Sequence, residues 1–368
     1  MPEGLKIKKK SSDTILDFLK NLFESNQISG VITLNRLSEN GAFSNSIISS
    51  PEDLKFAVPL YPLMPSNAGG VVGHVTRQCP FSVPIAVVLR PCELRALVEL
   101  KKRNHANMDN LILISYTCPG VYPLEMMRDG KVNQLIDQYW NSIKEISIPQ
   151  DIRPTCKGCE EFIPYIADIT IDVIGNDDPN STRIVANTEQ GKDIIKSLDG
   201  ESAEIELENE RNLEMREKRR EARKQLFEEN DSEGLGFEGL IKSFGKCVGC
   251  HSCRTVCPIC SCDLCYFDSR KTEYERKKFE SEITRKKGIR LPPDTIFYQM
   301  GRMAHISISC VGCGQCADVC PVNIPVSTIF MKVGQAVQEA FDYVPGKDIE
   351  AELPVTTYEP EEFVEVGE

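Results

Sequence analysis

The sequence lacks any apolar run long enough to cross a lipid bilayer. Its longest apolar runs, such as residues 85–89, are far shorter than the roughly 20 residues that a membrane-spanning helix needs. An export signal is also missing, because the basic residues 6–10 lead into a polar segment and not into an apolar one. Basic residues number 43 against 55 acidic ones, and the net charge of −12 disfavours nucleic acid or an anionic membrane as a partner. We therefore expect a soluble protein in a reducing cytoplasm.

Cysteine, in contrast, is abundant, with 16 residues in a chain of 368. A small secreted disulfide scaffold is excluded, because the chain is long and its cysteines cluster at the spacing of metal ligands. The length suits two or three domains, each with its own core.

Two cysteine runs near the C-terminal end share one pattern. CVGCHSCRTVCP occupies residues 247–258, and CVGCGQCADVCP occupies residues 310–321. The two-residue gaps let three thiolates bind three corners of one cubane cluster, and in the bacterial-ferredoxin arrangement the cysteine before the proline ligates the other cluster. We predict one [4Fe–4S] cluster held by Cys247, Cys250, Cys253 and Cys320, and a second held by Cys310, Cys313, Cys316 and Cys257. Zinc is the alternative, but it needs no third and fourth cysteine in each run.

The first half alternates helical and strand patterns. Apolar residues recur at the helical period between positions 15 and 23, and a β-branched run follows at 30–34. Further strand patterns occur at residues 85–89, 111–114, 166–174 and 183–186, and Pro91 opens a helix after the first of them. This alternation predicts an α/β domain with a mostly parallel sheet, followed by a small α+β dicluster ferredoxin-like domain.

Composition divides the chain into four parts. We expect the α/β domain at residues 1–200, a charged helical linker at 201–236, the ferredoxin-like domain at 237–345 and an acidic tail at 346–368. The basic stretch at residues 216–223 is interpreted as a solvated helix face. The linker and the tail are candidate contact surfaces for other subunits.

A second set of cysteines lies in the first half. Cys92 falls in the first turn of a helix, and Cys118 follows the end of the next strand, so a parallel sheet would bring both to its carboxyl edge. Cys156 and Cys159 add a C-x2-C pair. Together these four predict a third cluster, whereas the alternative is buried structural cysteines with one stray zinc half-site.

Four cysteines remain. Cys260, Cys262 and Cys265 crowd into six residues, and Cys79 is isolated. Either the three hold an additional, unnamed metal, completed by Cys79 or a partner chain, or they pack as small apolar residues around the neighbouring clusters. We favour the metal.

Two stretches of the first half resemble one family. RPCELRA at residues 90–96 and CKGCEEFIPYIADITI at 156–171 are similar to signature segments of the coenzyme F420 hydrogenase/dehydrogenase beta subunits, which include formate dehydrogenase beta subunits. The resemblance covers roughly residues 50–230. It implies a [4Fe–4S] cluster ligated by Cys92, Cys118, Cys156 and Cys159, and a bound FAD that exchanges hydride with coenzyme F420 and single electrons with the cluster.

The resemblance also suggests flavin contacts, and it has departures. The expected cofactor-binding residues are Asn67, Gly69, Gly70, Ser181, Thr182 and Thr188. The Gly-rich segment at 67–73 is not a G-x-G-x-x-G motif, however, and a plain turn is the alternative. The family's N-terminal Gly-Gly stretch is replaced by KKKSS at residues 8–12, Glu93 stands where Gln is commoner, and Asp172 stands where a small residue is usual.

Two functions fit these observations. The first is an oxidoreductase subunit that exchanges hydride between F420, or a related soluble carrier, and FAD, and passes electrons to partner subunits. Partners would be a formate dehydrogenase or hydrogenase catalytic subunit, or heterodisulfide-reductase-like subunits. The second is a non-catalytic iron–sulfur relay that has lost the carrier site. No side chain is predicted to be catalytic in either case.

Overall fold

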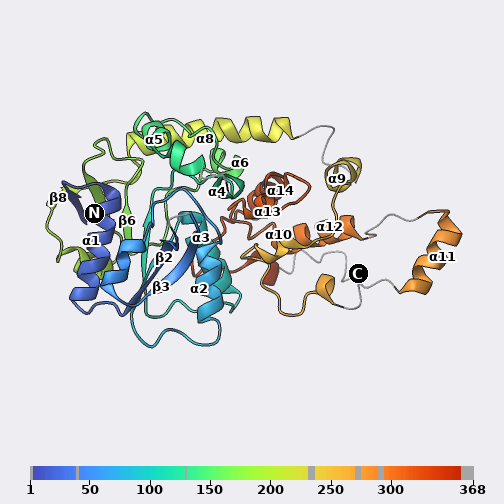
Figure 1. Ribbon diagram of the computed structural model, residues 1–368, viewed down its shortest axis with the longest axis horizontal. Coiled ribbons are helices and arrows are strands. Elements are labelled where there is room, and N and C mark those ends of the chain that lie inside the picture. The colour runs from blue at the N-terminus through green and yellow to red at the C-terminus, as the bar shows by residue number, and fades with distance from the viewer. Residues whose placement is uncertain are drawn as a thin grey trace, which may run out of the picture.

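The computed structural model describes residues 3–38, 41–128, 131–230, 237–269, 275–288 and 294–357. The first half contains one eight-stranded sheet (Figure 1). Its strands are β1 (Glu3–Ile7), β2 (Gly30–Arg36), β3 (Phe43–Ile48), β4 (Ile85–Val88), β5 (Leu111–Tyr116), β6 (Ile169–Ile171), β7 (Thr182–Ala186) and β8 (Glu201–Glu204). They are ordered β3-β2-β4-β5-β6-β7-β1-β8.

The centre of the sheet is parallel and its two flanks are antiparallel. Strands β2, β4, β5 and β6 run parallel, with Val88 beside Ile114 and Ile114 beside Ile169. These strands are almost wholly apolar and buried, as expected where helices cover both faces. Strands β3, β7, β1 and β8 pair antiparallel. The predicted strands are therefore confirmed, but the sheet is mixed and not mostly parallel.

Strand β1 was missed from sequence because it lies in a basic segment. Its backbone fills the gap between β7 and β8, with Leu5 opposite Ile184 and Ser202. Leu5 lies in the core and Ile7 packs against it, so the alternating pattern of this short strand is too brief to distinguish from a polar N-terminus. Strand β8 extends the sheet to Glu204, past the predicted domain boundary at residue 200.

Helices surround the sheet and lead into the second half. In the first half they are α1 (Ser11–Glu24), η1 (Pro51–Phe56), α2 (Ala68–Thr76), α3 (Pro91–Lys102), α4 (Glu125–Arg128), α5 (Lys131–Lys144), α6 (Pro154–Lys157), α7 (Glu189–Ile195) and α8 (Glu210–Glu229). The long helix α8 runs along one side of the molecule from the sheet towards the second half (Figure 1). Across the described ranges, no helix combines the length and the apolarity needed to cross a membrane.

The second half is helical where it is described. It contains α9 (Phe237–Phe244), α10 (Ser252–Thr255), η2 (Tyr266–Asp268), α11 (Arg276–Lys286), α12 (Thr295–Ile306), α13 (Gln315–Asp318), α14 (Val326–Ala340) and η4 (Pro354–Thr356). The expected α+β character is not seen, since residues 237–269, 275–288 and 294–357 form no strand. The segments 231–236 of the predicted linker and 358–368 of the predicted tail lie outside the described residues.

The beginning of the predicted tail packs against the first half. The backbone N–H of Gly346 donates to the buried carboxylate of Glu99 at 2.8 Å, and Arg95 Nε donates to the carbonyl oxygen of Pro345 at 2.7 Å. Both Glu99 and Arg95 come from α3. Residues 343–346 therefore tie the C-terminal part of the chain to the helix that carries Cys92.

Candidate iron–sulfur sites

Four predicted ligands surround one cavity in the second half. Cys310, Cys313 and Cys316 reach it from the loop before α13 and from α13 itself, and Cys257 reaches it from the other cysteine run. The loop turns tightly because Gly312 and Gly314 have φ angles of +66° and +82°, which glycine adopts without strain. Three cysteines of one run thus meet the fourth of the other, as the ferredoxin arrangement requires, and their ligand role stays a prediction.

The other run has the same local geometry. Gly249 and His251 take positive φ angles of 65° and 57°, and α10 then begins one residue before Cys253. Cys247 and Cys253 are buried, whereas Cys250 is exposed. The turn after Cys320 lies close to this run, because Lys246 donates from Nζ to the carbonyl oxygen of Asn323 at 3.0 Å.

Helix α12, between the two runs, contacts Cys253 with three polar side chains. Arg302 Nη1 lies 3.0 Å from the Sγ of Cys253. Tyr298 Oη lies 3.8 Å and Gln299 Nε2 lies 3.9 Å from the same sulfur. Sequence reasoning missed these residues, although their i, i+1 and i+4 spacing places them on one helix face. His251, within the run, stacks on Tyr298 with ring centroids 4.0 Å apart, and it contacts Asp268.

The cysteines of the first half converge at the carboxyl edge of the sheet. Burial, above all other causes, raises the pKa of Cys92 well above its ordinary value, and neighbouring negative groups raise it further. Those neighbours are Glu93, Cys118, Cys313 and Cys156, so three of the four predicted ligands lie close together and beside the second half. Cys159 follows in the same turn as Cys156, and its N–H donates to the Cys156 carbonyl oxygen at 3.3 Å. Their role as ligands stays a prediction.

Burial also keeps these thiols from ionising without a metal. It raises the pKa of Cys118 to about 12, against the opposing charge of Arg90. In the second half, burial raises the pKa of Cys313 to about 11, although hydrogen bonds from Gln315 and Asn67 act the other way. Since only the thiolate binds a metal, filling such sites would release protons.

Buried arginines line the sites. Arg219 of α8 is 1% exposed and donates to the carbonyl oxygens of Cys118 and Cys159, at 3.1 and 3.3 Å. The interpretation of residues 216–223 as a solvated face is therefore wrong at Arg219. Arg153, also 1% exposed, donates to the carbonyl oxygen of Cys313 at 3.1 Å and pairs with Asp318 at 2.6 Å. Both arginines belong to elements that touch a predicted cluster.

Cys260, Cys262, Cys265 and Cys79 are the cysteines outside the three predicted cluster sets. Where the structure describes the chain, no three His, Cys, Asp or Glu side chains are close enough to hold one metal ion. A hydrogen bond with Cys257, more than burial, raises the pKa of Cys260. Cys262 and Cys79 are exposed, and Cys265 is partly buried. An additional metal at Cys260, Cys262 and Cys265 stays a prediction.

Of the predicted flavin contacts, those near residue 67 have structural roles. Asn67 caps α2, its Oδ1 accepting from the Gly70 N–H at 3.1 Å. A Cβ atom at Gly69 would overlap the carbonyl oxygen of Glu93, and one at Gly70 would lie 3.1 Å from Cβ of Pro258. The Glu93 carboxylate in turn accepts from the N–H of Ala68 at 3.1 Å. The two glycines let α2 pack against α3 and against the loop that follows Cys257.

The other predicted flavin contacts lie elsewhere. Thr182 is on β7, three strands from β4, and its hydroxyl donates to the carbonyl oxygen of Lys9 at 2.7 Å. Thr188 caps α7 and donates to Asp168 at 2.6 Å. The hydroxyl of Ser181 is buried within its own turn, against Asn176 and Asp178. The structure does not bring these residues together with Asn67, and their role as flavin contacts stays a prediction.

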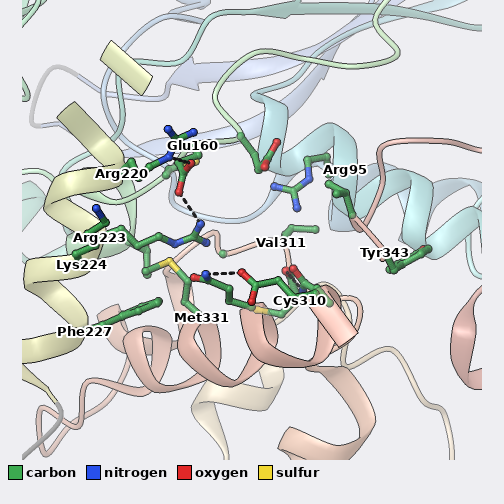
Figure 2. Close-up of a pocket in the computed structure, with 18 of the residues that line it drawn as sticks. Arg95, Glu160, Arg220, Arg223, Lys224, Phe227, Cys310, Val311, Met331 and Tyr343 are labelled. Atoms are coloured by element: carbon green, nitrogen blue, oxygen red, sulfur yellow. Dashed lines mark hydrogen bonds and ion pairs between the residues drawn. The ribbon is translucent and has the colours of Figure 1, made fainter. Parts of the chain in front are cut away.

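A large cavity lies between α8, α14 and the predicted third cluster (Figure 2). Its volume is about 480 Å³, and Cys159 and Cys310, from two different predicted clusters, line it. Arg220 and Arg223 pair with Glu160 at its wall, and Phe227 adds an aromatic ring. Within the described residues, three buried polar atoms of the lining have no hydrogen-bond partner: Thr155 Oγ1, Arg223 Nε and Gln335 Oε1. Sequence reasoning missed this cavity because its walls come from segments more than 100 positions apart.

Two family models match this chain, one in each half. Residues 84–212 match the family model for the C terminus of the coenzyme F420 hydrogenase/dehydrogenase beta subunit, and residues 243–324 match the 4Fe-4S dicluster domain. The F420-dependent formate dehydrogenase subunit beta of Methanocaldococcus jannaschii is 25% identical over 94% of both chains. The F420-dependent formate dehydrogenase 1 subunit beta of Methanococcus maripaludis is 29% identical over 90% of both chains.

A solved structure was also found to be similar. It is a xenon derivative of the F420-reducing [NiFe] hydrogenase complex from Methanosarcina barkeri, which matches 64% of this chain and 92% of that chain at 15% identity with a TM-score of 0.44. The sequence matches span both halves of the chain. They assign residues 84–212 to the C-terminal domain of coenzyme F420 hydrogenase/dehydrogenase beta subunits and residues 243–324 to a 4Fe–4S dicluster domain.

Proposed function

We propose that this protein is the iron–sulfur electron-transfer beta subunit of an F420-dependent oxidoreductase complex. It would carry three [4Fe–4S] clusters, held by the three cysteine sets described above, and FAD. The observation that supports this most directly is that Cys92, from the first half, packs against the same hydrophobic cluster of the second half as Cys313. A cluster at Cys92, Cys118, Cys156 and Cys159 would therefore adjoin the cluster of Cys310, Cys313, Cys316 and Cys257.

The three clusters would form a linear electron-transfer path, called the wire below. Cys310, Cys313 and Cys316 share their cavity with Cys257, whose run also contains Cys247, Cys250 and Cys253. Electrons would pass from the first-half cluster through the middle cluster to the one that includes the exposed Cys250. A buried centre at one end and an exposed ligand at the other suit a protein that hands electrons to a partner.

The cavity between α8 and α14 fits a flavin better than the residues predicted from sequence. Its arginines can face a pyrophosphate, and Phe227 and Met331 offer apolar contacts. Arg95, Arg223 and Lys224 would hold the anionic part, and Cys159 would keep the neighbouring cluster close. When bound, FAD would exchange hydride with F420 and single electrons with that cluster.

The chain's own residues would orient the cofactors and keep water out. Arg219 joins α8 to the backbone around Cys118 and Cys159, so α8 forms both a wall of the cavity and a cover for the cluster. Partner subunits would supply the substrate chemistry. A formate dehydrogenase catalytic subunit is the first choice, since both relatives at 25–29% identity are named as formate dehydrogenase subunits. Pull-down experiments with the full chain would distinguish this partner from a hydrogenase or a heterodisulfide-reductase-like subunit.

One anaerobic experiment tests this function. Iron and flavin are quantified per chain, and reduction of the clusters by reduced F420 and by NAD(P)H is then followed by visible absorbance. We expect about twelve iron atoms, one flavin and reduction by reduced F420. About eight iron atoms without flavin would contradict the first-half cluster and the hydride exchange together.

The relay without a carrier site is a second candidate, and one observation favours it. Gly69 and Gly70 were predicted to contact flavin. Instead they pack closely against Glu93 and Pro258. A chain with about twelve iron atoms, no flavin and no reaction with reduced F420 would establish the relay.

A further inference from the structure

We infer that Arg302 raises the reduction potential of the cluster held by Cys247, Cys250, Cys253 and Cys320 above that of its neighbour. The inference rests on the proposed function, because both cysteine sets of the second half must hold clusters. Helix α12 would thereby determine at which of the two clusters electrons leave the protein.

The guanidinium of Arg302 contacts the sulfur of one predicted ligand. Arg302 is 3% exposed, and its Nη1 lies 3.0 Å from the Sγ of Cys253. Its Nη2 donates to the carbonyl oxygen of the same cysteine at 3.2 Å. Gln299 supports this geometry from the same helix face, since its Oε1 accepts from Arg302 Nη1 at 3.2 Å. One hydrogen bond joins the guanidinium of Arg302 to the sulfur of Cys253, and two others fix its position.

Within the described part of the chain, no carboxylate neutralises the charge of Arg302. The ring of Phe330 lies 4.7 Å from its guanidinium carbon. An arginine stays charged even when buried, and a buried unpaired charge is strongly unfavourable. A cluster-bound thiolate at Cys253 would supply the missing negative charge.

The neighbouring ligand set has an arginine of a different kind. Arg153 reaches the carbonyl oxygen of Cys313, but its charge is neutralised by Asp318 at 2.6 Å. Arg302 also lines the cavity of Cys257, Cys310, Cys313 and Cys316, but the predicted ligand sulfur to which it hydrogen-bonds is that of Cys253. Because electrostatic energy falls with distance, the cluster of Cys253 would experience the larger effect. Reduction adds negative charge to a cluster, so a nearby cation and hydrogen bonds to sulfur favour the reduced state.

This asymmetry has a consequence for electron flow. The cluster with the higher potential is also the one with the exposed ligand Cys250. Electrons that arrive from the first half would collect at the end of the wire that faces outward. A partner would therefore take them at the side of Cys250.

The test uses the full chain purified anaerobically, with iron content measured for each variant. The midpoint potentials of wild type, Arg302→Gln and Arg302→Lys are determined by redox titrations followed by electron paramagnetic resonance. We expect Arg302→Gln to lower one potential much more than the other, and Arg302→Lys to stay close to wild type. Cys250→Ser identifies the affected signal, because it alters the cluster to which Cys250 belongs.

Arg254→Gln is the matched control. Arg254 directly follows Cys253, but its guanidinium pairs with Asp268, so its removal should leave both potentials nearly unchanged. Gln299→Leu removes the weaker amide contacts to Cys247 and Cys253, at 3.7 and 3.9 Å, and should lower the same potential by a smaller amount. This variant serves if Arg302→Gln loses iron.

The outcomes separate the inference from the proposed function. Unchanged potentials in iron-replete Arg302→Gln, or in Gln299→Leu where Arg302→Gln loses iron, overturn the role of α12 and leave the clusters in place. A wild-type chain that binds no cluster in its second half would instead overturn the proposed function, before any variant is compared.

Discussion

Arg219 and Cys118 are 101 positions apart, yet the guanidinium of Arg219 donates to the carbonyl oxygen of Cys118 at 3.1 Å. A second bond joins Arg219 to the carbonyl oxygen of Cys159, and the ring of Phe162 lies 4.7 Å from the guanidinium carbon. The most charged helix of the chain is therefore anchored to the backbone of two predicted cluster ligands.

Replacing Arg219 by Ala should loosen this anchor. Two buried carbonyl oxygens would lose their donor, so we expect the free energy of unfolding to fall by about 1–3 kcal/mol. The iron of the first-half cluster should be lost preferentially, measured as iron per chain after gel filtration. Glu221→Ala is the control, because Glu221 pairs with Lys224 at an exposed position of the same helix and does not line the cavity. Equal iron loss in both variants would contradict the anchoring role.

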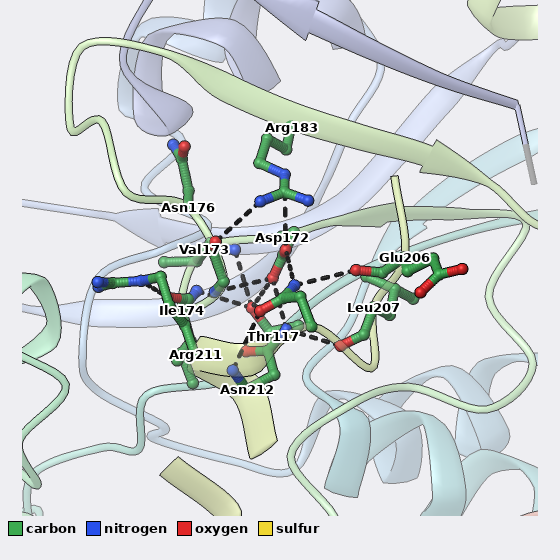
Figure 3. Close-up of polar contacts among 12 residues, drawn as sticks. Thr117, Asp172, Val173, Ile174, Asn176, Arg183, Glu206, Leu207, Arg211 and Asn212 are labelled. Carbon is green, nitrogen blue, oxygen red and sulfur yellow. Dashed lines mark hydrogen bonds and ion pairs between the residues drawn. The ribbon is translucent and has the colours of Figure 1, made fainter. Parts of the chain in front are cut away.

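Asp172 should hold the start of α8 in place (Figure 3). This fully buried carboxylate accepts from the side chains of Asn212 and Asn209, both at 2.9 Å, and from the hydroxyl of Thr117 at 3.2 Å. Asp172→Ala would leave these donors and the nearby Arg183 without their acceptor. We expect a loss of about 3–5 kcal/mol, measured by chemical denaturation, and earlier proteolytic cleavage around α8.

The control for Asp172 is Asp178→Ala. Asp178 lies in an exposed turn, where its Oδ1 accepts from the N–H of Asn180 at 2.9 Å. Its replacement should change the free energy of unfolding by less than about 1 kcal/mol. If Asp172→Ala were equally mild, the network in Figure 3 would not be what holds α8.

The two adjacent glycines should differ in their tolerance of a methyl group. Gly69→Ala would force the Cβ atom into the carbonyl oxygen of Glu93, whereas Gly70→Ala needs only a small shift of Pro258. We expect Gly69→Ala to cost about 1–3 kcal/mol or more, and Gly70→Ala clearly less, in thermal unfolding. The ratio of flavin to folded protein should not change in Gly70→Ala. A selective loss of flavin there would instead restore the sequence-based prediction of a flavin loop.

We predict that the fourth cysteine of each run ligates the cluster of the other run, and ligand variants test this exchange. Cys257→Ser should disturb the same paramagnetic signal as Cys313→Ser, because both sulfurs line one cavity. Cys320→Ser should resemble Cys250→Ser. Cys79→Ser is the control and should keep the iron of all three clusters, since Cys79 is exposed and belongs to none of the three predicted cluster sets. If Cys257→Ser resembled Cys250→Ser, each run would hold its own cluster with all four cysteines.

Local patterns predicted much of the fold. The apolar runs at β2, β4 and β5 are strong signals, because their side chains are buried on both faces of the sheet. Pro91, the first residue of α3, is a strong signal for the start of that helix. Strand β1 and the antiparallel flank were not predictable, since pairing there depends on backbone bonds between distant segments. Arg219 and Arg302 resemble solvated charges in sequence and are buried only because other elements cover them.

The sequence by itself determined the cysteine spacing, and with it the dicluster domain, because ligand geometry at one cluster depends on residues a few positions apart. It also carries the similarity of residues 84–212 to the C-terminal domain of coenzyme F420 hydrogenase/dehydrogenase beta subunits. Only the tertiary structure brought Cys92 next to Cys313, assigned the two glycines to helix packing and opened a cavity between α8 and α14. Contacts between segments hundreds of residues apart depend on how the sheet and the helices pack, and no local pattern records that packing.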